Sequence, residues 1–494
     1  MIATKEKSSN TENNLLEETR SWQKYLFFRP FYASKNLLDL CPTHKKGTKY
    51  TSRFSKNTTL MLENQVIDPK SFDLVLGFGC LESSQNAAKI LDQLSSSKST
   101  LILSVSKKYG EKKFKDQIEK HFSKRKIQYL YQENTWPALV KNKKPKDYSD
   151  IIAVIGDVEL PKWPKLGISI PTYTGAKDLE QAFISMTKTY PGELLFAIAA
   201  NSCSKENLAI LDRLEKNFSD QVVVLKSKEN LGYGRGANKG LKYLQDQAKV
   251  DYYVVSNDDV LAGMDCICLQ VAAMEELEKL GHNPGTIGPV SGAVSGVQCV
   301  DIGKYSNLEE LEEKVDDWHA ANHQELFITK RIRGLFLLIH PKVLKEIGGF
   351  DPIFGIGNYE DDDHNARVHF AGYTQWIAKG AYLYHKGSQT FINMKVDYAK
   401  LMNTNGRIFN QKWRVEDMPL AFELNEKPKH IDLFIPLDAG PISKKYSFEM
   451  DGKEIDLVHE ATDIEFLGYL MWKFQVDPTI NREKILDIVE SKAS

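Results

Sequence analysis

The sequence has almost no charge excess, no paired cysteines and no long apolar run, and each absence excludes a class of protein. It carries 65 Lys and Arg against 66 Asp and Glu, so no overall basic excess points to nucleic acid. The six cysteines are scattered without a Cys-x-x-Cys pair, a pattern typical of free thiols in a reducing compartment. No apolar run reaches the ~18 residues that a membrane-spanning helix needs.

The composition is that of an ordinary globular protein. Apolar residues make up 42% and charged residues 27% of the chain, and the length favours about three domains. Residues 1–20 are polar and charged, so we expect a disordered tail there and not a secretory signal. We therefore expect a cytoplasmic protein. Peripheral contact with the inner face of a membrane stays open, and the oligomeric state is unknown.

Residues 21–145 alternate between strand-like and helix-like segments. Strand patterns lie at residues 36–41, 58–62, 72–78 and 100–105, and helical patterns at 84–94 and 112–122. This alternation predicts a parallel sheet. Through residues 37–42 and 72–76 the segment resembles a shortened class I methyltransferase domain. That fold needs glycines after the first strand, so that the backbone can approach the cofactor. Here only Gly47 follows the strand. We expect a degenerate Rossmann-like domain that does not bind S-adenosylmethionine, then a linker over residues 146–165 with a candidate short strand at 151–155.

A second alternation of strands and helices begins at residue 166 and predicts a doubly wound α/β unit. Strand patterns lie at residues 168–170, 194–199, 222–225 and 252–256, with helical patterns at 179–189, 205–218 and 238–247. Ligands bind such sheets beyond the carboxyl ends of the strands. The polar residues at these ends are Thr172, Tyr173, Asn201, Asn230 and the run Asn257-Asp258-Asp259.

Two of these segments have both a chemical and a plain structural interpretation. Asn257-Asp258-Asp259 offers oxygen ligands for a hard divalent cation, but the same residues are common in turns. The glycine-rich run at residues 230–240 permits close backbone approach to phosphate, with Arg235 and Lys239 beside it. Many such loops are ordinary turns.

An acidic run, Glu360-Asp361-Asp362-Asp363, follows a Gly-Gly-Phe-Asp-Pro turn. The positive end of a helix dipole accounts for acids at this place without any function. His385 follows a further strand pattern, where a single histidine is usually structural.

The order of these motifs resembles that of the family 2 glycosyltransferases, which invert configuration and have the GT-A fold. The motifs are Pro-Thr-Tyr, Asn-Leu-Gly-Tyr-Gly-x-Gly-x-Asn-x-Gly, Asn-x-Asp, Gly-Gly-Phe-Asp with Glu-Asp-x-Asp, and Tyr-His-x-Gly-Ser. The resemblance is to rhamnosyl- and galactofuranosyltransferase-like members and covers residues 166–414, half the chain. A Lys-Trp pair at residues 412–413 also matches.

The resemblance implies a role for each matching residue. Asp259 and His385 would bind Mn²⁺ or Mg²⁺, and Asp361 would be the general base, with Glu360 and Asp363 in support. Asp362 would be only solvated. The residues that would bind the nucleotide sugar are Pro171, Thr172, Tyr173, Asn201, Asn230, Gly232, Arg235, Asn238, Asn257 and Asp258.

The sequence departs from the family pattern at one position and extends it in two segments. Ala200 stands where an Asp usually reads the nucleotide base, so either Asn201 replaces that contact or the nucleotide sits differently. Residues 301–330 form an acidic insert, either an amphipathic surface helix or a lid on the acceptor side. Residues 415–494 are expected to form an α+β C-terminal extension with an aromatic stripe at 469–474.

We therefore expect an inverting, metal-dependent glycosyltransferase of polysaccharide biosynthesis that uses a UDP- or dTDP-sugar. Its acceptor would be a hydroxyl of a glycan or glycolipid. One alternative is a sugar nucleotidyltransferase, although residues 171–175 lack the glycine-rich loop and Lys that it needs. The other is a non-catalytic protein that binds nucleotides or glycans.

Overall fold

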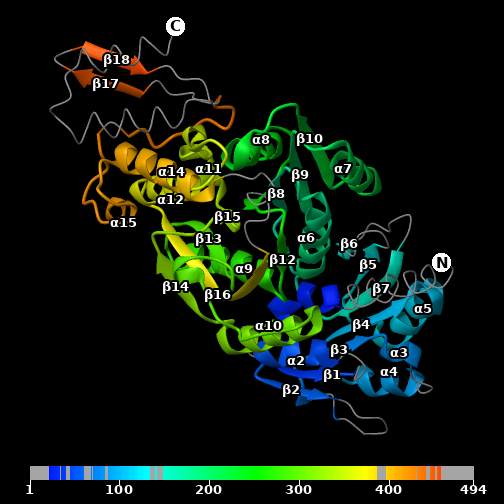
Figure 1. The fold of residues 1–494 in the computed structure, drawn as a ribbon. Coiled ribbons are helices and arrows are strands. Elements are labelled where there is room, and N and C mark those ends of the chain that lie inside the picture. Colours follow the sequence, from blue (N-terminus) through cyan, green and yellow to red (C-terminus); the bar gives the residue numbers. More distant parts are fainter. Residues whose placement is uncertain are drawn as a thin grey trace. The chain divides into compact units, whose positions relative to one another are not determined.

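The computed structural model describes residues 22–33, 35–40, 45–60, 68, 71–83, 87–133, 139–141, 148–386, 397–429, 431–440, 446–450 and 453–457. The expected tail, the loop at residues 41–44 and the aromatic stripe at 469–474 lie outside these ranges. The chain divides into two compact units (Figure 1). One comprises Met1–Trp163 with Thr187–Glu193, and the other Pro164–Met186 with Leu194–Ser494.

The first unit contains a seven-stranded sheet in the order β2-β1-β3-β4-β7-β5-β6. Its strands are β1 (Asn36–Asp39), β2 (Asn57–Leu60), β3 (Leu74–Phe78), β4 (Thr100–Ser106), β5 (Ile127–Glu133), β6 (Leu139–Lys141) and β7 (Tyr148–Ile155). Its α-helices are α2 (Lys45–Phe54), α3 (Cys80–Ser83), α4 (Ala87–Ser95) and α5 (Glu111–Phe122).

The sheet of the first unit is parallel only in part. The strands β2, β1, β3 and β4 are parallel, as predicted. Residues 148–155 form β7, which is longer than the candidate strand at 151–155 and pairs antiparallel with both β4 and β5. The last five residues of β7 are all buried, so both faces of the sheet are covered at this strand.

The second unit contains a nine-stranded mixed sheet in the order β10-β9-β8-β11-β15-β13-β16-β12, with β14 on β16. The strands are β8 (Leu166–Thr172), β9 (Leu194–Asn201), β10 (Val222–Ser227), β11 (Tyr252–Ser256), β12 (Val260–Ala262), β13 (Pro284–Val290), β14 (Leu326–Thr329), β15 (Phe336–Ile339) and β16 (Thr374–His385). A separate hairpin joins β17 (Tyr446–Met450) to β18 (Lys453–Leu457).

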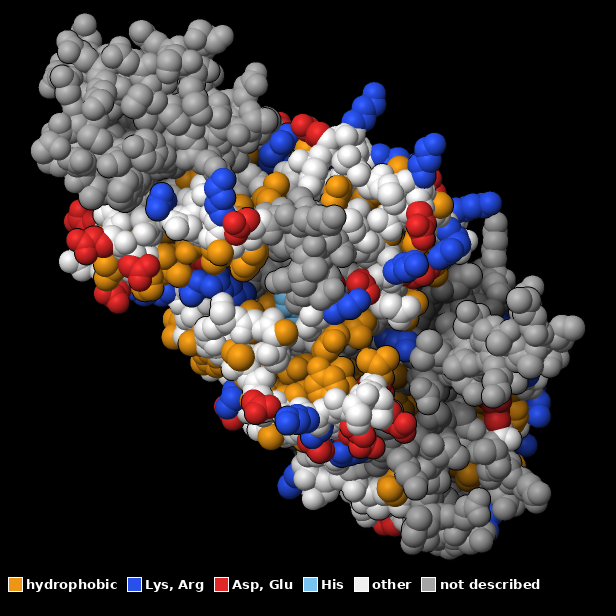
Figure 2. All heavy atoms as spheres, in the orientation of Figure 1, with side chains coloured by type: hydrophobic (Ala, Val, Ile, Leu, Met, Phe, Trp, Pro, Cys, Tyr) orange, Lys and Arg blue, Asp and Glu red, His pale blue; other side chains and the backbone are white. Residues whose placement is uncertain are grey.

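The first three helices of the second unit alternate with the strands β8 to β11, as predicted. The helices of this unit are α6 (Ala176–Thr189), α7 (Lys205–Asn217), α8 (Gly232–Gln247), α9 (Cys266–Lys279), α10 (Leu308–Asn322), α11 (Pro341–Glu346), α12 (Glu360–Phe370), α14 (Tyr398–Trp413) and α15 (Met418–Ala421). The predicted α/β class is confirmed. Among the described helices, none is both long and apolar enough to cross a membrane. Figure 2 shows basic and acidic side chains interspersed on the visible face of this unit.

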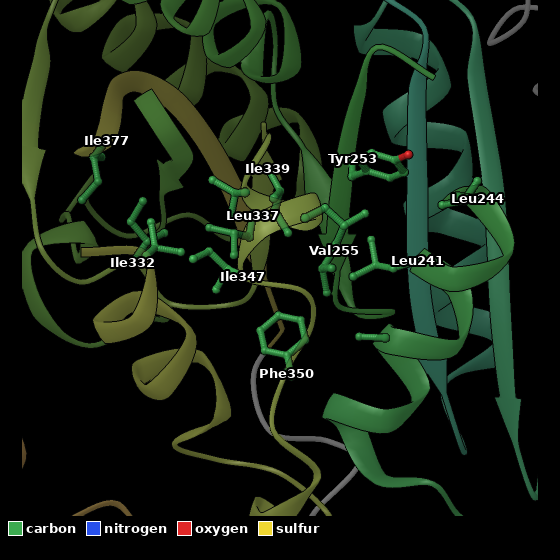
Figure 3. Packing of buried hydrophobic residues seen from close by; sticks show 14 of the residues in the cluster. Leu241, Leu244, Tyr253, Val255, Ile332, Leu337, Ile339, Ile347, Phe350 and Ile377 are labelled. Carbon is green, nitrogen blue, oxygen red and sulfur yellow. The ribbon is translucent and has the colours of Figure 1, made fainter. Parts of the chain in front are cut away.

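The core of the second unit lies between α8 and the middle of its sheet. Ala237, Leu241 and Leu244 recur at helical spacing and are fully or almost fully buried. They belong to one apolar cluster with Val255 of β11 and Leu337 of β15 (Figure 3). Because β8, β9 and β11 are parallel, their carboxyl ends lie at the same edge of the sheet.

The acidic insert and the start of the expected extension both belong to this unit. In α10 the apolar face, including Leu311 and Val315, is buried, which favours a packed helix over a lid. Beyond residue 414, Met418 and Ile431 join an apolar cluster with Trp413, so the expected boundary at 414 divides a single core.

Gly348 packs closely against the backbone of Ile435. Its φ is +71°, and a Cβ there would lie 1.9 Å from the carbonyl oxygen of Ile435. Gly372 has a φ of +85°, but a Cβ there would meet nothing within 4 Å. Both glycines need the left-handed conformation, and only Gly348 also needs the space.

We expect Gly348→Ala to lower the free energy of unfolding by about 1–3 kcal/mol more than Gly372→Ala, because only the first substitution overfills a packed contact. Each would also bear ~1 kcal/mol or more for the left-handed conformation. Denaturant titration measures both. Equal losses in the two variants would contradict the contact between Gly348 and Ile435.

Candidate functional site

A cavity of about 590 Å³ opens at the carboxyl ends of the central strands of the second unit. It brings together most of the residues selected from sequence: Pro171, Thr172, Tyr173, Asn201, Asn230, Gly232, Asn257, Asp258, Asp259, Glu360, Asp361 and His385. These residues span more than 200 positions of the chain, so only the fold makes them neighbours. A cavity of this size is in the usual range for small-molecule sites.

Asp259 and His385 meet at one part of the cavity because β12 pairs with β16, which places His385 opposite Val260. The His385 Nε2 lies 3.2 Å from Asp259 Oδ1 and 3.1 Å from Asn257 Nδ2. The His385 Nδ1 lies 2.8 Å from the carbonyl oxygen of Ala293. A carbonyl only accepts, so Nδ1 carries the proton and Nε2 is directed toward Asp259.

This pair fits a divalent cation by its donor chemistry. A carboxylate oxygen and an imidazole nitrogen converge, and a backbone carbonyl fixes the ring, as is common for metal-binding histidines. Burial alone would lower the pKa of His385, but the hydrogen bond and charge of Asp259 outweigh it and raise that pKa. The described residues contain no group of three or more His, Cys, Asp or Glu suited to a metal. The further ligands of a cation would therefore not be a third side chain of these types from the described residues.

Polar residues at the ends of β8 and β9 form another wall. The Thr172 hydroxyl lies 2.6 Å from Asp258 Oδ2, and burial raises the pKa of Asp258 to about 7. The Asn201 side chain donates to the carbonyl of Gly232 at 2.9 Å, while its buried Oδ1 has no partner within the described ranges. A buried oxygen such as Asn201 Oδ1, which receives no hydrogen bond from the described residues, can accept one from an N–H or O–H group of a ligand.

Asp361 lies at the first turn of α12 and is held by backbone donors. Its Oδ2 accepts from Gly334 N–H at 3.0 Å and its Oδ1 from Asp362 N–H at 2.8 Å. Burial and then the charge of Asp362 raise the pKa of Asp361, so these effects outweigh the backbone donors and Arg333. The pKa of Glu360 is raised well above its usual range, by burial and by Asp361, and Glu360 Oε2 has no partner among the described residues. Burial thus disfavours the ionised form of both acids.

Asp362 is not solvated, contrary to expectation. It is 1% exposed and bonds to Arg331 Nε at 2.5 Å and to Arg333 Nη1 at 2.8 Å. Both arginines line the cavity, and we did not select either from the sequence. The sequence signal that could have identified them is the spacing of the two arginines in Lys-Arg-Ile-Arg-Gly, because alternate side chains of an extended segment point to the same side.

Three selected residues lie outside the cavity lining. Asp363 is fully buried and bonds to Arg367 at 2.8 Å and to Lys412 at 2.5 Å. Asn238 forms two 2.8 Å hydrogen bonds with the backbone of Phe350. Arg235 pairs with Glu229 at 2.9 Å. In each case a protein partner engages the polar group, so the geometry favours structural roles.

Aromatic and flexible apolar side chains complete the rim. Tyr359, Tyr398 and Met402 line the cavity with Asn358. Asn358 and Tyr359 have φ values of +71° and +72°, a left-handed pair that non-glycine residues rarely adopt. Tyr398 donates to Asn358 Oδ1 at 3.2 Å, which links α14 to this turn. Motif reading did not select these four residues.

Asp363 and Asp361 should respond in opposite directions to Asn substitution. Lys412 and Arg367 outweigh burial and lower the pKa of Asp363, so its contribution to stability is present at neutral pH and lost as the pH falls through that pKa. A raised pKa at Asp361 means that stability falls as the pH rises through it. We expect Asp363→Asn to lose about 3–5 kcal/mol at neutral pH, and Asp361→Asn to keep or raise the melting temperature. Thermal unfolding measures both, and an equal loss would contradict this division.

Residues 168–293 match the model of the family described as glycosyl transferase family 2. No curated protein sequence matches the chain. A structure of GalNAc-T7 with UDP, GalNAc and Mn²⁺ is similar at 13% identity and a TM-score of 0.37, over 53% of this chain and 54% of that one. A structure of S. aureus TarS residues 1–349 with UDP is similar at 14% identity and a TM-score of 0.33, over 51% of this chain and 72% of that one. The chain thus spans about half the length of the GalNAc-T7 chain. Over residues 168–293, about a quarter of its length, the chain is therefore similar to glycosyl transferase family 2.

Proposed function

We propose that this protein transfers a sugar from a nucleotide diphosphate donor to a hydroxyl acceptor with inversion of configuration. The observation that carries the proposal is that Asp361 shares one cavity with the Asp259 and His385 pair. A proton acceptor and a site for a charged leaving group are the two elements that a single in-line displacement needs. The family match supports the same reaction class.

The Asp259 and His385 pair and Asp361 would have separate roles in this reaction. Asp259 and His385 would hold Mn²⁺ or Mg²⁺, which would neutralise charge on the donor diphosphate. Asp361 would take the proton of the acceptor hydroxyl as that oxygen forms its bond to the anomeric carbon. The bond from that carbon to the diphosphate oxygen breaks, and the nucleoside diphosphate leaves with the electron pair. Attack on the face opposite the leaving group inverts the configuration.

The remaining residues support donor binding and acceptor orientation. Thr172, Tyr173 and Asn230 would border the nucleotide. The unpartnered Oδ1 of Asn201 would accept from the base, which compensates for Ala200 and suits the N3–H of uracil or thymine in UDP or dTDP. Glu360, when protonated, would donate to a substrate hydroxyl. We propose a glycan or glycolipid acceptor, and a cytoplasmic location with peripheral contact at the inner membrane face.

Asp361→Asn should lower turnover by about 10²–10⁴-fold, because the amide cannot take a proton. Release of nucleoside diphosphate from a panel of UDP- and dTDP-sugars with Mn²⁺ measures turnover, and calorimetry measures UDP binding, which should be unchanged. The exposed Asp212→Asn is the matched control. A fully active Asp361→Asn variant would contradict the assignment of the base. Absence of both release and nucleotide binding in the wild type would contradict the function.

His385→Ala and Asp259→Asn should each weaken Mn²⁺ binding about 10-fold or more in the presence of UDP, because each removes a ligand. Electron paramagnetic resonance of free Mn²⁺ measures this without any turnover. His282→Ala is the control, since His282 is exposed and lies outside the cavity lining. Unchanged Mn²⁺ affinity in both variants would contradict the metal site.

A further inference from the structure

The cavity contains a pair of arginines whose hydrogen-bonding capacity is only partly used. Arg331 directs Nε and Nη2 at the Asp362 carboxylate. Arg333 directs Nη1 at Asp362 and Nε at the Ser295 hydroxyl, both at 2.8 Å. Within the part of the chain that the structure describes, Arg331 Nη1 and Arg333 Nη2 have no hydrogen-bond partner. Both side chains line the cavity and are about one quarter exposed, at 29% and 23%.

Holding Asp362 in place requires only one of these two guanidinium groups. Arg331 already forms a two-bond fork with both carboxylate oxygens, the strongest geometry for this pair of groups. Arg333 adds a second positive charge, and its Nη1 lies 3.8 Å from Asp361 Oδ2. When Asp361 takes a proton, the group is left with two positive charges against Asp362 alone. The second arginine therefore has a use beyond the neutralisation of Asp362.

The arginine pair lies on the side of the proton acceptor. Asp362 directly follows Asp361, and Gly334, which directly follows Arg333, donates to Asp361. Asp259 and His385 meet at the β12–β16 pairing, and no hydrogen bond or ion pair of the described residues joins them to either arginine. In an in-line displacement the acceptor oxygen and the leaving diphosphate lie on opposite faces of the anomeric carbon. A group beside the proton acceptor is therefore placed to contact the acceptor substrate.

We propose that Arg331 and Arg333 bind an anionic group, phosphate or carboxylate, on the acceptor substrate. The acceptor is then an acidic glycan or a phosphate-bearing polyol or lipid, and not a neutral sugar. Guanidinium groups suit oxyanions through their planar donor edge, and Asp362 and Ser295 hold these two in position before the substrate arrives. This inference rests on the proposed glycosyl transfer, because that reaction defines which side of the cavity receives the acceptor.

The test measures the binding of small acceptor probes with Mn²⁺ and UDP already at saturation. The probes are glucose, glucose 6-phosphate and glucuronate, and calorimetry gives each dissociation constant. We expect the wild type to bind at least one anionic probe about 10-fold or more tightly than glucose, a difference of ~1.4 kcal/mol. No saturable binding of either anionic probe, or no preference over glucose, would overturn the proposal. Loss of UDP binding itself would instead count against the proposed function.

The variants separate substrate binding from structural support. Arg331→Gln and Arg333→Gln should each remove most of the anionic preference, and Arg→Lys at either position should keep part of it. The double variant Arg331→Gln/Asp362→Asn removes one charge of each sign, so it tests the same loss with the local charge balance kept. The exposed Arg213→Gln is the control. If the Gln variants weaken UDP binding and leave the preference intact, the pair serves the donor diphosphate and the proposal is wrong.

Discussion

The site depends on how one helix start accommodates four consecutive buried carboxylates. All four, from Glu360 to Asp363, are less than one tenth exposed. A helix dipole does not compensate so much buried charge, since its effect is about half an elementary charge. The carboxylates are instead balanced in different ways, and these differences separate Glu360 and Asp361 from Asp362 and Asp363.

The two later acids each form close ion pairs with two cations, whereas Asp361 has only the more distant Arg333, at 3.8 Å. Asp363 is enclosed by Arg367 and Lys412, and Asp362 by Arg331 and Arg333. Asp361 accepts from two backbone N–H groups, and Glu360 Oε2 has no partner among the described residues. Burial raises the pKa of both Glu360 and Asp361, because neither has a close ion pair that outweighs it. The same paired charges also fix the helix, because removing one partner of a buried pair leaves an uncompensated charge.

The mixed sheet supplies the second half of the site. Antiparallel pairing of β12 with β16 brings His385 beside Asp259, although 126 positions of the chain separate them. The loop that holds Ala293 then fixes the imidazole, and Ser295 of the same loop holds Arg333. One short loop therefore connects the candidate metal pair to the arginines beside Asp361.

The sequence by itself determined the α/β class, most strands, and the candidate residues whose motifs have a fixed order. That succeeds because strand ends and glycine-rich turns are local features that place polar groups at one edge of a sheet. Only the tertiary structure decided that Asp362 is buried and paired, that Asp363 and Asn238 face their own partners, and that β7 lies inside the first sheet. The partners of Asp362 lie about thirty residues away, at Arg331 and Arg333. Local pattern cannot indicate such pairings, because they arise from the packing of segments that are distant in the chain.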